Sequence, residues 1–207
     1  MLFHNVLQLI EEKGESLLLL DVDATLVIPD NIFIHKKNPD GTITKLSPAQ
    51  YAREKVNKEN QKNYSFDEFR DPQKVYNSIK TGIPLIPNLK IVDEYIHRGW
   101  KIGILTARGM EEVVFKALKD WLMYKDTRGN LRDIGDKLVR DLVHAVNDSN
   151  RQYEGSTDFE KKANVIKKLA TQYDRIVFLD DTPSNIEAVR KLRLQNVFPK
   201  LANKMES

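Results

Sequence analysis

The sequence contains no cysteine, which excludes disulfides, thiol nucleophiles and zinc sites built on thiolates. The apolar run Leu17–Leu20 is far too short for a signal peptide or a membrane span, and the N-terminus lacks a basic region. We therefore expect a cytoplasmic protein with no membrane partner. The histidines are scattered without metal-ligand spacing, so no metal role is expected for any of them: His4, His35, His97 and His144.

Neither sign of charge is in large excess. The net charge of +3 permits an anionic partner but does not require nucleic acid or a membrane surface. A chain of 207 residues suffices for one hydrophobic core and is too short for two full-sized domains. With 41% hydrophobic and 30% charged residues, the composition is that of a globular protein.

Three short apolar runs have the pattern of strands that are buried on both faces of a sheet. They are Leu17–Leu20, Lys101–Leu105 and Arg175–Leu179. Apolar residues at helical spacing occur over residues 89–96, 110–122, 159–173 and 182–192, and residues 196–198 indicate a last short strand. This alternation of buried strands and helices predicts an α/β fold with a doubly wound parallel sheet.

Two stretches interrupt the alternation. The first, residues 28–83, holds the turn sequence Asn38–Gly41 between two apolar runs, which predicts a hairpin. We interpret this stretch as a small inserted cap-like segment. The second, residues 124–155, has a weak helical pattern and a strand signal at Val143–Val146. The predicted core then consists of residues 1–27 and 84–207.

Polar residues follow each of the three buried strands: Asp21 and Asp23 the first, Thr106 the second, Asp180 and Asp181 the third. In a doubly wound sheet, ligands bind outside the carboxyl ends of the strands, so these side chains are expected to meet at one site. Four carboxylates there would repel one another unless a cation neutralised them, and a carboxylate-rich site with room for water suits Mg²⁺. Each motif alone is typical of a turn or a helix cap, but their recurrence on three strands favours a functional site.

In order and context these residues resemble the four motifs of the haloacid dehalogenase superfamily. The motifs are Asp21–Thr25, Thr106, a lysine that opens the next helix, and the pair Asp180 and Asp181. The resemblance implies a Rossmann-like core and is to the phosphatase branch, where the residue two after the nucleophile is aspartate. Ala24 stands where members often have glycine, at a position that does no chemistry. The similarity extends over about residues 16–26, 84–122 and 157–198 and includes neither interruption.

The resemblance implies that Asp21 attacks phosphorus and carries a phosphoaspartyl intermediate. Asp23 would protonate the leaving alkoxide and then take a proton from the hydrolytic water. Mg²⁺ would be held by Asp21, the backbone carbonyl of Asp23 and Asp180, with Asp181 binding it directly or through water. Thr106 would hydrogen-bond a phosphoryl oxygen, and the lysine would offset the remaining negative charge.

Two adjacent lysines, Lys161 and Lys162, stand where the family's lysine would fall. Thr157 to Glu160 form a capping box, so a helix should start at Thr157. At about 100° per residue, Lys162 lies about 40° from Ile166 and within the apolar stripe, whereas Lys161 lies about 140° away and faces water. A lysine on a buried face needs an anionic partner, which the carboxylate cluster would supply. We therefore predict that Lys162 enters the site.

These patterns favour a Mg²⁺-dependent phosphatase acting on a phosphomonoester, with a small phosphorylated substrate such as a nucleotide or a nucleic-acid end. One alternative is a nucleic-acid end-processing 3′-phosphatase, similar to the phosphatase domains of polynucleotide kinases but without a kinase, because no P-loop motif is present. The other is a non-catalytic binding protein on the same fold, which the presence of every expected catalytic residue type argues against.

Other positions are less informative. Arg108 is equally well a contact for substrate phosphate or a surface arginine, and Asn185 either orients Asp180 or Asp181 or is a local cap. Residues 28–83 hold ten Lys or Arg and seven Asp or Glu, an excess of three. That excess hints at a substrate with more than one negative charge, although a solvated surface explains it as simply.

Overall fold

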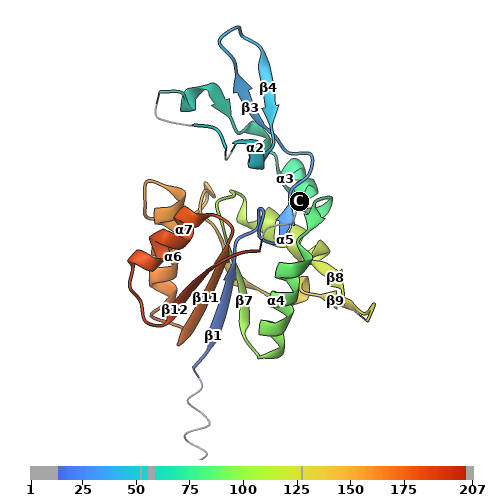
Figure 1. The fold of residues 1–207 in the computed structure, drawn as a ribbon, viewed down its shortest axis with the longest axis vertical. Coiled ribbons are helices and arrows are strands. Elements are labelled where there is room, and N and C mark those ends of the chain that lie inside the picture. Colours follow the sequence, from blue (N-terminus) through green and yellow to red (C-terminus); the bar gives the residue numbers. More distant parts are fainter. Residues whose placement is uncertain (1–13, 52, 56–58, 127, 204–207) are drawn as a thin grey trace, which may run out of the picture.

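The computed structural model describes residues 14–51, 53–55, 59–126 and 128–203. Its central sheet has five strands, all parallel, in the order β10-β7-β1-β11-β12 (Figure 1). The strands span Ser16–Leu20 (β1), Lys101–Thr106 (β7), Leu138–Ala145 (β10), Arg175–Asp180 (β11) and Val197–Leu201 (β12). The expected α/β fold with a parallel sheet is confirmed.

Helices cover both faces of this sheet, α4 (Ile86–His97) and α5 (Glu111–Trp121) on one and α6 (Asp158–Leu169) and α7 (Pro183–Lys191) on the other (Figure 1). The run of leucines in β1 reflects this arrangement, because successive side chains of a strand point to opposite faces. Leu18 and Leu20 pack toward α4 and α5, and Leu17 and Leu19 toward α6 and α7. Burying one such side chain contributes about 1.5–3 kcal/mol. Within the described ranges, no helix combines the length and apolar character needed to cross a membrane.

The inserted segment leaves and rejoins the core through a two-stranded ribbon, in which β2 (Val27–Ile28) pairs antiparallel with β6 (Ile83–Pro84). The predicted hairpin is confirmed, with a turn at Gly41, whose φ of +84° suits glycine. In Figure 1 the part of the segment that contains this hairpin lies beyond the carboxyl ends of the parallel strands. It consists of β3 (Ile34–Lys37), β4 (Ile43–Leu46), α2 (Pro48–Tyr51), η1 (Gln61–Asn63), β5 (Tyr64–Ser65) and η2 (Asp67–Arg70).

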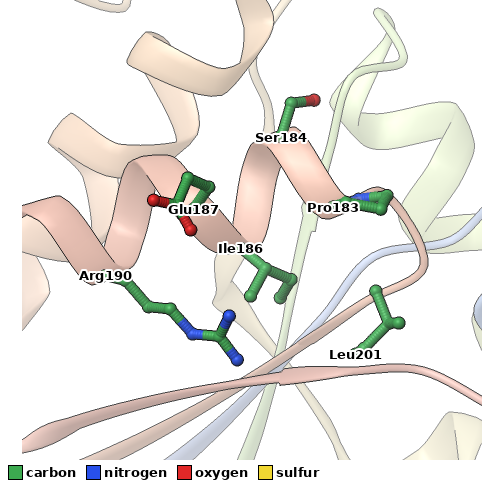
Figure 2. A pocket seen from close by; sticks show the side chains of 6 residues that line it. All are labelled: Pro183, Ser184, Ile186, Glu187, Arg190 and Leu201. Carbon is green, nitrogen blue, oxygen red and sulfur yellow. The ribbon is translucent and has the colours of Figure 1, made fainter.

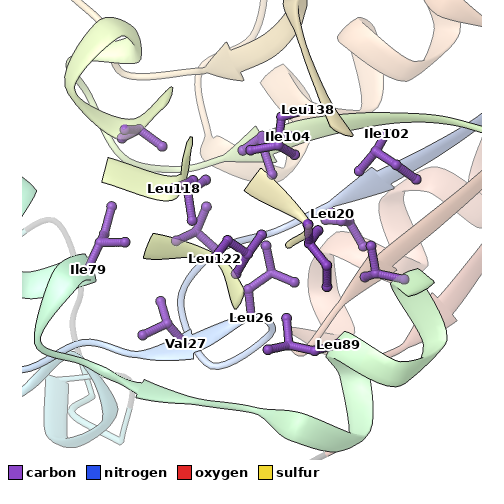
Figure 3. Packing of buried hydrophobic residues seen from close by; sticks show 14 of the residues in the cluster. Leu20, Leu26, Val27, Ile79, Leu89, Ile102, Ile104, Leu118, Leu122 and Leu138 are labelled. Atoms are coloured by element: carbon purple, nitrogen blue, oxygen red, sulfur yellow. The ribbon is translucent and has the colours of Figure 1, made fainter. Parts of the chain in front are cut away.

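The last helix of the segment, α3 (Pro72–Lys80), packs with the core instead. Its Val75 and Ile79 are fully buried in the same hydrophobic cluster as Leu118 of α5 (Figure 3). Asp71 caps this helix by accepting hydrogen bonds from the backbone amides of the first turn. By packing, the segment therefore divides into a small projecting sheet and a helix fixed against α5.

The second interruption forms strands and no α-helix within its described residues, so the weak helical pattern was misleading. A hairpin pairs β8 (Met123–Lys125) with β9 (Leu131–Asp133), and η3 (Gly135–Lys137) leads into β10. Gly129 lies in the hairpin turn with a φ of +80°. The strand signal at Val143 was correct, but β10 begins earlier, at Leu138.

Candidate metal centre and active site

Three of the predicted acidic residues meet where β1 and β11 end. The two strands pair in register, Leu20 with Leu179, and the amide of Asp21 donates to the carbonyl of Leu179 at 2.9 Å. One carboxylate oxygen from each of Asp21, Asp180 and Asp181 lies within 4.8 Å of the others. Asp21 and Asp180 are buried, whereas Asp181 is partly exposed. The tips of two neighbouring strands thus bring together a carboxylate cluster.

Lys162 lies inside this cluster. Its Nζ donates to Oδ1 of Asp21 at 2.7 Å and to Oδ2 of Asp180 at 2.8 Å, and the residue is 1% exposed. The capping box of α6 and the predicted helix phase are both confirmed, since the neighbouring Lys161 is partly exposed and bonds Asn147 instead. Burial opposes the charge on Lys162, but Asp21 and Asp180 outweigh it and raise the pKa of the amine above its ordinary value.

The cluster carries more negative than positive charge. Burial raises the pKa of Asp21 well above its ordinary value; Lys162 opposes this rise, and the nearby Asp180 and Asp23 add to it. Burial, followed by the charge of Asp180, also raises the pKa of Asp181. Carboxylate oxygens are the ligands that Mg²⁺ prefers, and the partial exposure of Asp181 leaves access for water ligands. The donor set therefore fits a hard divalent cation.

Asp180 is oriented by the start of α7. The side-chain amide of Asn185 donates to its two carboxylate oxygens at 3.0 and 2.9 Å, and the backbone amide of Thr182 donates to Oδ1 at 2.8 Å. Thr182 and Pro183 occupy the N-cap and first helical positions of α7, but the Thr182 hydroxyl forms no capping bond. Asn185 thus contacts Asp180, one of the roles that the sequence left open.

A tight turn follows Asp21. The carbonyl of Val22 accepts from the amides of Thr25, Leu26 and Val27, and the Thr25 hydroxyl accepts from the amide of Asp181 at 3.1 Å. Ala24 has a φ of +55°, in the left-handed region that favours glycine. The departure noted at Ala24 therefore bears on the geometry of this turn.

The Asp23 carboxylate is not part of the cluster but pairs with Arg108. Nε of Arg108 donates to Oδ2 at 2.8 Å and Nη2 to Oδ1 at 2.7 Å. Arg108 is 4% exposed, so the interpretation of this residue as a surface arginine is wrong. Its Nη1 also reaches α3, donating to Oγ of Ser78 at 3.0 Å and to the carbonyl of Val75 at 3.5 Å. The position of Arg108 two residues after Thr106, opposite two acids, was the signal that could have identified it.

Thr106 ends β7, which pairs with β1 on the side opposite β11, and the residue is fully buried. Its hydroxyl accepts from the amide of Arg108 at 3.2 Å. It does not cap α5, whose N-cap is Met110. Thr106 therefore lies at the same edge of the sheet as Asp21, without the capping role that was the simpler explanation for it.

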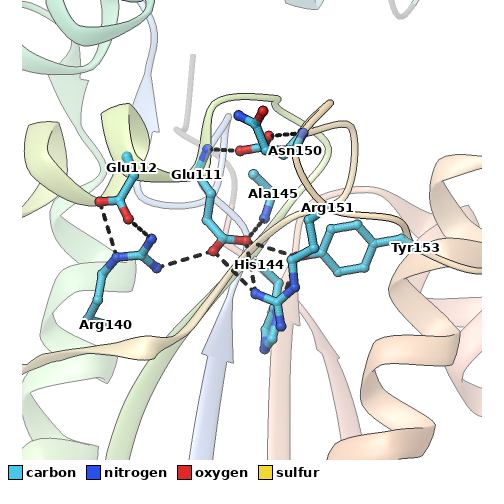
Figure 4. A network of polar contacts seen from close by, with 9 residues as sticks. Glu111, Glu112, Arg140, His144, Ala145, Asn150, Arg151 and Tyr153 are labelled. Carbon is cyan, nitrogen blue, oxygen red and sulfur yellow. Dashed lines mark hydrogen bonds and ion pairs between the residues drawn. The ribbon is translucent and has the colours of Figure 1, made fainter.

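A polar network around the buried Glu111 fixes the loop that follows β10 (Figure 4). The carboxylate of Glu111 accepts from Nη1 of Arg140 and of Arg151, each at 3.2 Å, and from the Tyr153 hydroxyl at 2.9 Å. His144 lies beside Tyr153, and burial followed by the charge of Arg151 lowers its pKa to about 4, so it is neutral near pH 7. The network holds the loop against the start of α5.

Two surface hollows lie beside the cluster rather than over it. Figure 2 shows one of about 450 Å³ between α7 and the end of β12. A second hollow of similar volume lies between surface residues of α6 and α7. Neither is lined by a clustered carboxylate, so the chemistry and not the hollows identifies the site. The first is lined by Pro183, Ser184, Ile186, Glu187, Arg190 and Leu201.

No protein-family model matches the chain, and no curated protein matches its sequence. The case for a function therefore rests on the residues of the site and on their geometry.

Proposed function

We propose that the chain is a Mg²⁺-dependent phosphatase that hydrolyses a phosphomonoester through a phosphoaspartyl intermediate on Asp21. The fold would be that of the haloacid dehalogenase superfamily, phosphatase branch, with residues 28–83 inserted as a cap. One observation carries the proposal: the fully buried Lys162 bridges Asp21 and Asp180, with Asp181 completing a carboxylate cluster. Burying several charges together is costly for stability alone, which is why such clusters mark functional sites.

The metal would be held by Asp21, Asp180 and the backbone carbonyl of Asp23, with Asp181 as a direct or water-mediated ligand. Bound there, it would neutralise charge between an anionic nucleophile and an anionic phosphate. The chain's own part is to keep these oxygens in place. Asn185 and the amide of Thr182 do so for Asp180.

The remaining residues divide the reaction between them. An oxygen of Asp21 forms a bond to phosphorus as the bond to the leaving oxygen breaks, and Asp23 gives its proton to that oxygen. Asp23 then takes a proton from water, whose oxygen displaces Asp21 and releases inorganic phosphate. Thr106 donates its hydroxyl proton to a phosphoryl oxygen, and Lys162 offsets the negative charge around it.

Release of phosphate from 4-nitrophenyl phosphate, with and without Mg²⁺, tests this proposal. We expect release that depends on Mg²⁺ and is abolished by Asp21→Asn, because an amide is not a nucleophile. Asp21→Asn should not destabilise the fold, since it removes a charge from a crowded, buried cluster. Near wild-type turnover by Asp21→Asn would refute the covalent mechanism, and no release by the wild type would favour the non-catalytic alternative.

A substrate panel separates the two enzymatic alternatives. It should hold phosphorylated metabolites, nucleotides and oligonucleotides with a 3′- or a 5′-phosphate. Preference for the 3′-phosphorylated oligonucleotide over every small ester would favour the end-processing function. Preference for a small ester would favour a metabolite phosphatase.

A further inference from the structure

We propose that Ser78, on helix α3 of the inserted segment, is a positioning residue that acts through Arg108 to aim the Asp23 carboxylate at the leaving group. This inference rests on the proposed function and adds a residue that touches neither metal nor phosphate. Asp23 and Arg108 are 85 residues apart in the chain, and Arg108 and Ser78 are 30 apart. Three distant segments therefore meet at one guanidinium.

The hydrogen-bond capacity of each group fixes the arrangement. The only hydroxyl proton of Ser78 is donated to the carbonyl of Val75 at 2.8 Å, so its oxygen meets Arg108 as an acceptor. Arg108 has one edge, Nε and Nη2, on Asp23 and its third nitrogen, Nη1, on α3. A guanidinium is planar and rigid, so fixing Nη1 on α3 also fixes the direction of the edge that Asp23 binds.

Burial makes this restraint effective. Ser78 is fully buried and the Arg108 side chain is 2% exposed, whereas the Asp23 side chain is 28% exposed. Only the Asp23 end of this chain of contacts is open to solvent. Among the described residues, Arg108 gives this carboxylate its side-chain hydrogen bonds, and without them it would be free to swing toward Lys162 or a bound cation, where it would not reach the leaving oxygen.

The leaving group decides how much this positioning matters. An alkoxide is a poor leaving group and needs the proton that Asp23 gives, whereas 4-nitrophenolate leaves without one. In the step that forms the phosphoenzyme, a misaligned acid should therefore slow alkyl phosphates and spare aryl phosphates. A residue that merely packs would slow both classes equally.

The test compares kcat/KM for glycerol phosphate and for 4-nitrophenyl phosphate in wild type and Ser78→Ala, with saturating Mg²⁺, because kcat/KM reports the formation of the phosphoenzyme and not its hydrolysis. We expect Ser78→Ala to lower kcat/KM for the alkyl ester about tenfold more than for the aryl ester, a part of the roughly 10²–10⁴-fold that proton transfer contributes. Thr81→Ala is the matched control: Thr81 is exposed near the same helix end, and among the described residues its hydroxyl bonds the carbonyl of Asn77 and not Arg108. Its ratio of rates should equal that of the wild type.

If Ser78→Ala does not fold, Arg108→Lys tests the contact between Arg108 and Ser78 from the side of the guanidinium. A lysine keeps the charge but cannot bond Asp23 and α3 together, so the same selective loss on the alkyl ester is expected. Equal losses on both esters, or none, in these variants would overturn the positioning role while leaving the proposed function intact. A wild type inactive on both esters would overturn both.

Discussion

Replacing Lys162 with Met examines the charge balance of the site, because it removes the ammonium group and keeps most of the side-chain volume. In the wild type this one amine is bonded to Asp21 and to Asp180, and all three residues are buried. In the variant, two buried carboxylates face each other and Asp181 with no cation between them. The loss therefore measures uncompensated charge rather than a cavity.

The size of the loss in stability follows from the known cost of breaking buried ion pairs. Removing one partner of a buried ion pair costs about 3–5 kcal/mol. A domain is stable by only about 5–15 kcal/mol, so in EDTA the variant should lose about a fifth or more of its stability. Mg²⁺ should return part of this loss, because a ligand at 100 times its Kd contributes about 2.7 kcal/mol.

The assay is urea unfolding in EDTA and in Mg²⁺, together with initial rates on an aryl phosphate. Lys161→Met is the control, since the partly exposed Lys161 bonds Asn147 and no carboxylate of the cluster, and surface changes usually alter stability by less than about 0.5 kcal/mol. We expect Lys162→Met to lose turnover by orders of magnitude and Lys161→Met to stay near wild type. Identical unfolding in EDTA and identical rates for the two variants would refute the reasoning.

Three further predictions concern the metal, the insertion and pH. Chelation with EDTA should abolish phosphate release and Mg²⁺ should restore it, while Ca²⁺ supports little turnover because its looser coordination spoils in-line alignment; full activity after exhaustive chelation would contradict the metal's role. Replacing residues 36–64 with two glycines should preserve metal binding, measured by calorimetry, because His35 and Ser65 are paired neighbours that a two-residue turn can join. The same replacement should change the order of rates across the substrate panel, and an unchanged order would contradict the role of the segment as a cap. The pKa of buried His144 is about 4, against 6.5 for an unperturbed histidine, so between these values the unfolded chain binds a proton that the folded chain does not. The free energy of unfolding should therefore fall by about 2.5 kcal/mol more in the wild type than in His144→Asn between about pH 7.5 and about pH 4.5. Urea unfolding at both pH values measures this, and equal pH dependence of the two proteins would count against it.

The sequence was most informative where one element's own pattern decides the outcome. The leucines of β1 and the acids that end it could be placed because a strand with two buried faces has one end at the sheet edge. Lys162 could be distinguished from Lys161 because the rotation per residue of a helix is fixed. The capping box set the start of that helix.

The sequence was least informative where contacts with distant segments determine how a residue is placed. Whether Arg108 is buried depends on α3, which lies 30 residues earlier and whose packing on α5 no local period reveals. The positive φ of Ala24 follows from the carbonyl of Val22 gathering three amides, a property of the folded turn. The pattern in residues 124–155 was misleading because strand pairing around Gly129 outweighed a weak helical preference.

The central claim, a covalent intermediate on Asp21, is tested most directly by trapping it. Asp23→Asn cannot activate the hydrolytic water, yet Asp21 can still attack an aryl phosphate whose leaving group needs no proton. Mixing this variant with 4-nitrophenyl phosphate and Mg²⁺, quenching in acid and mapping its peptides by mass spectrometry should locate one phosphoryl group on Asp21. Phosphate on another residue, or an unmodified Asp21 peptide while the first equivalent of nitrophenolate is released, would contradict the account.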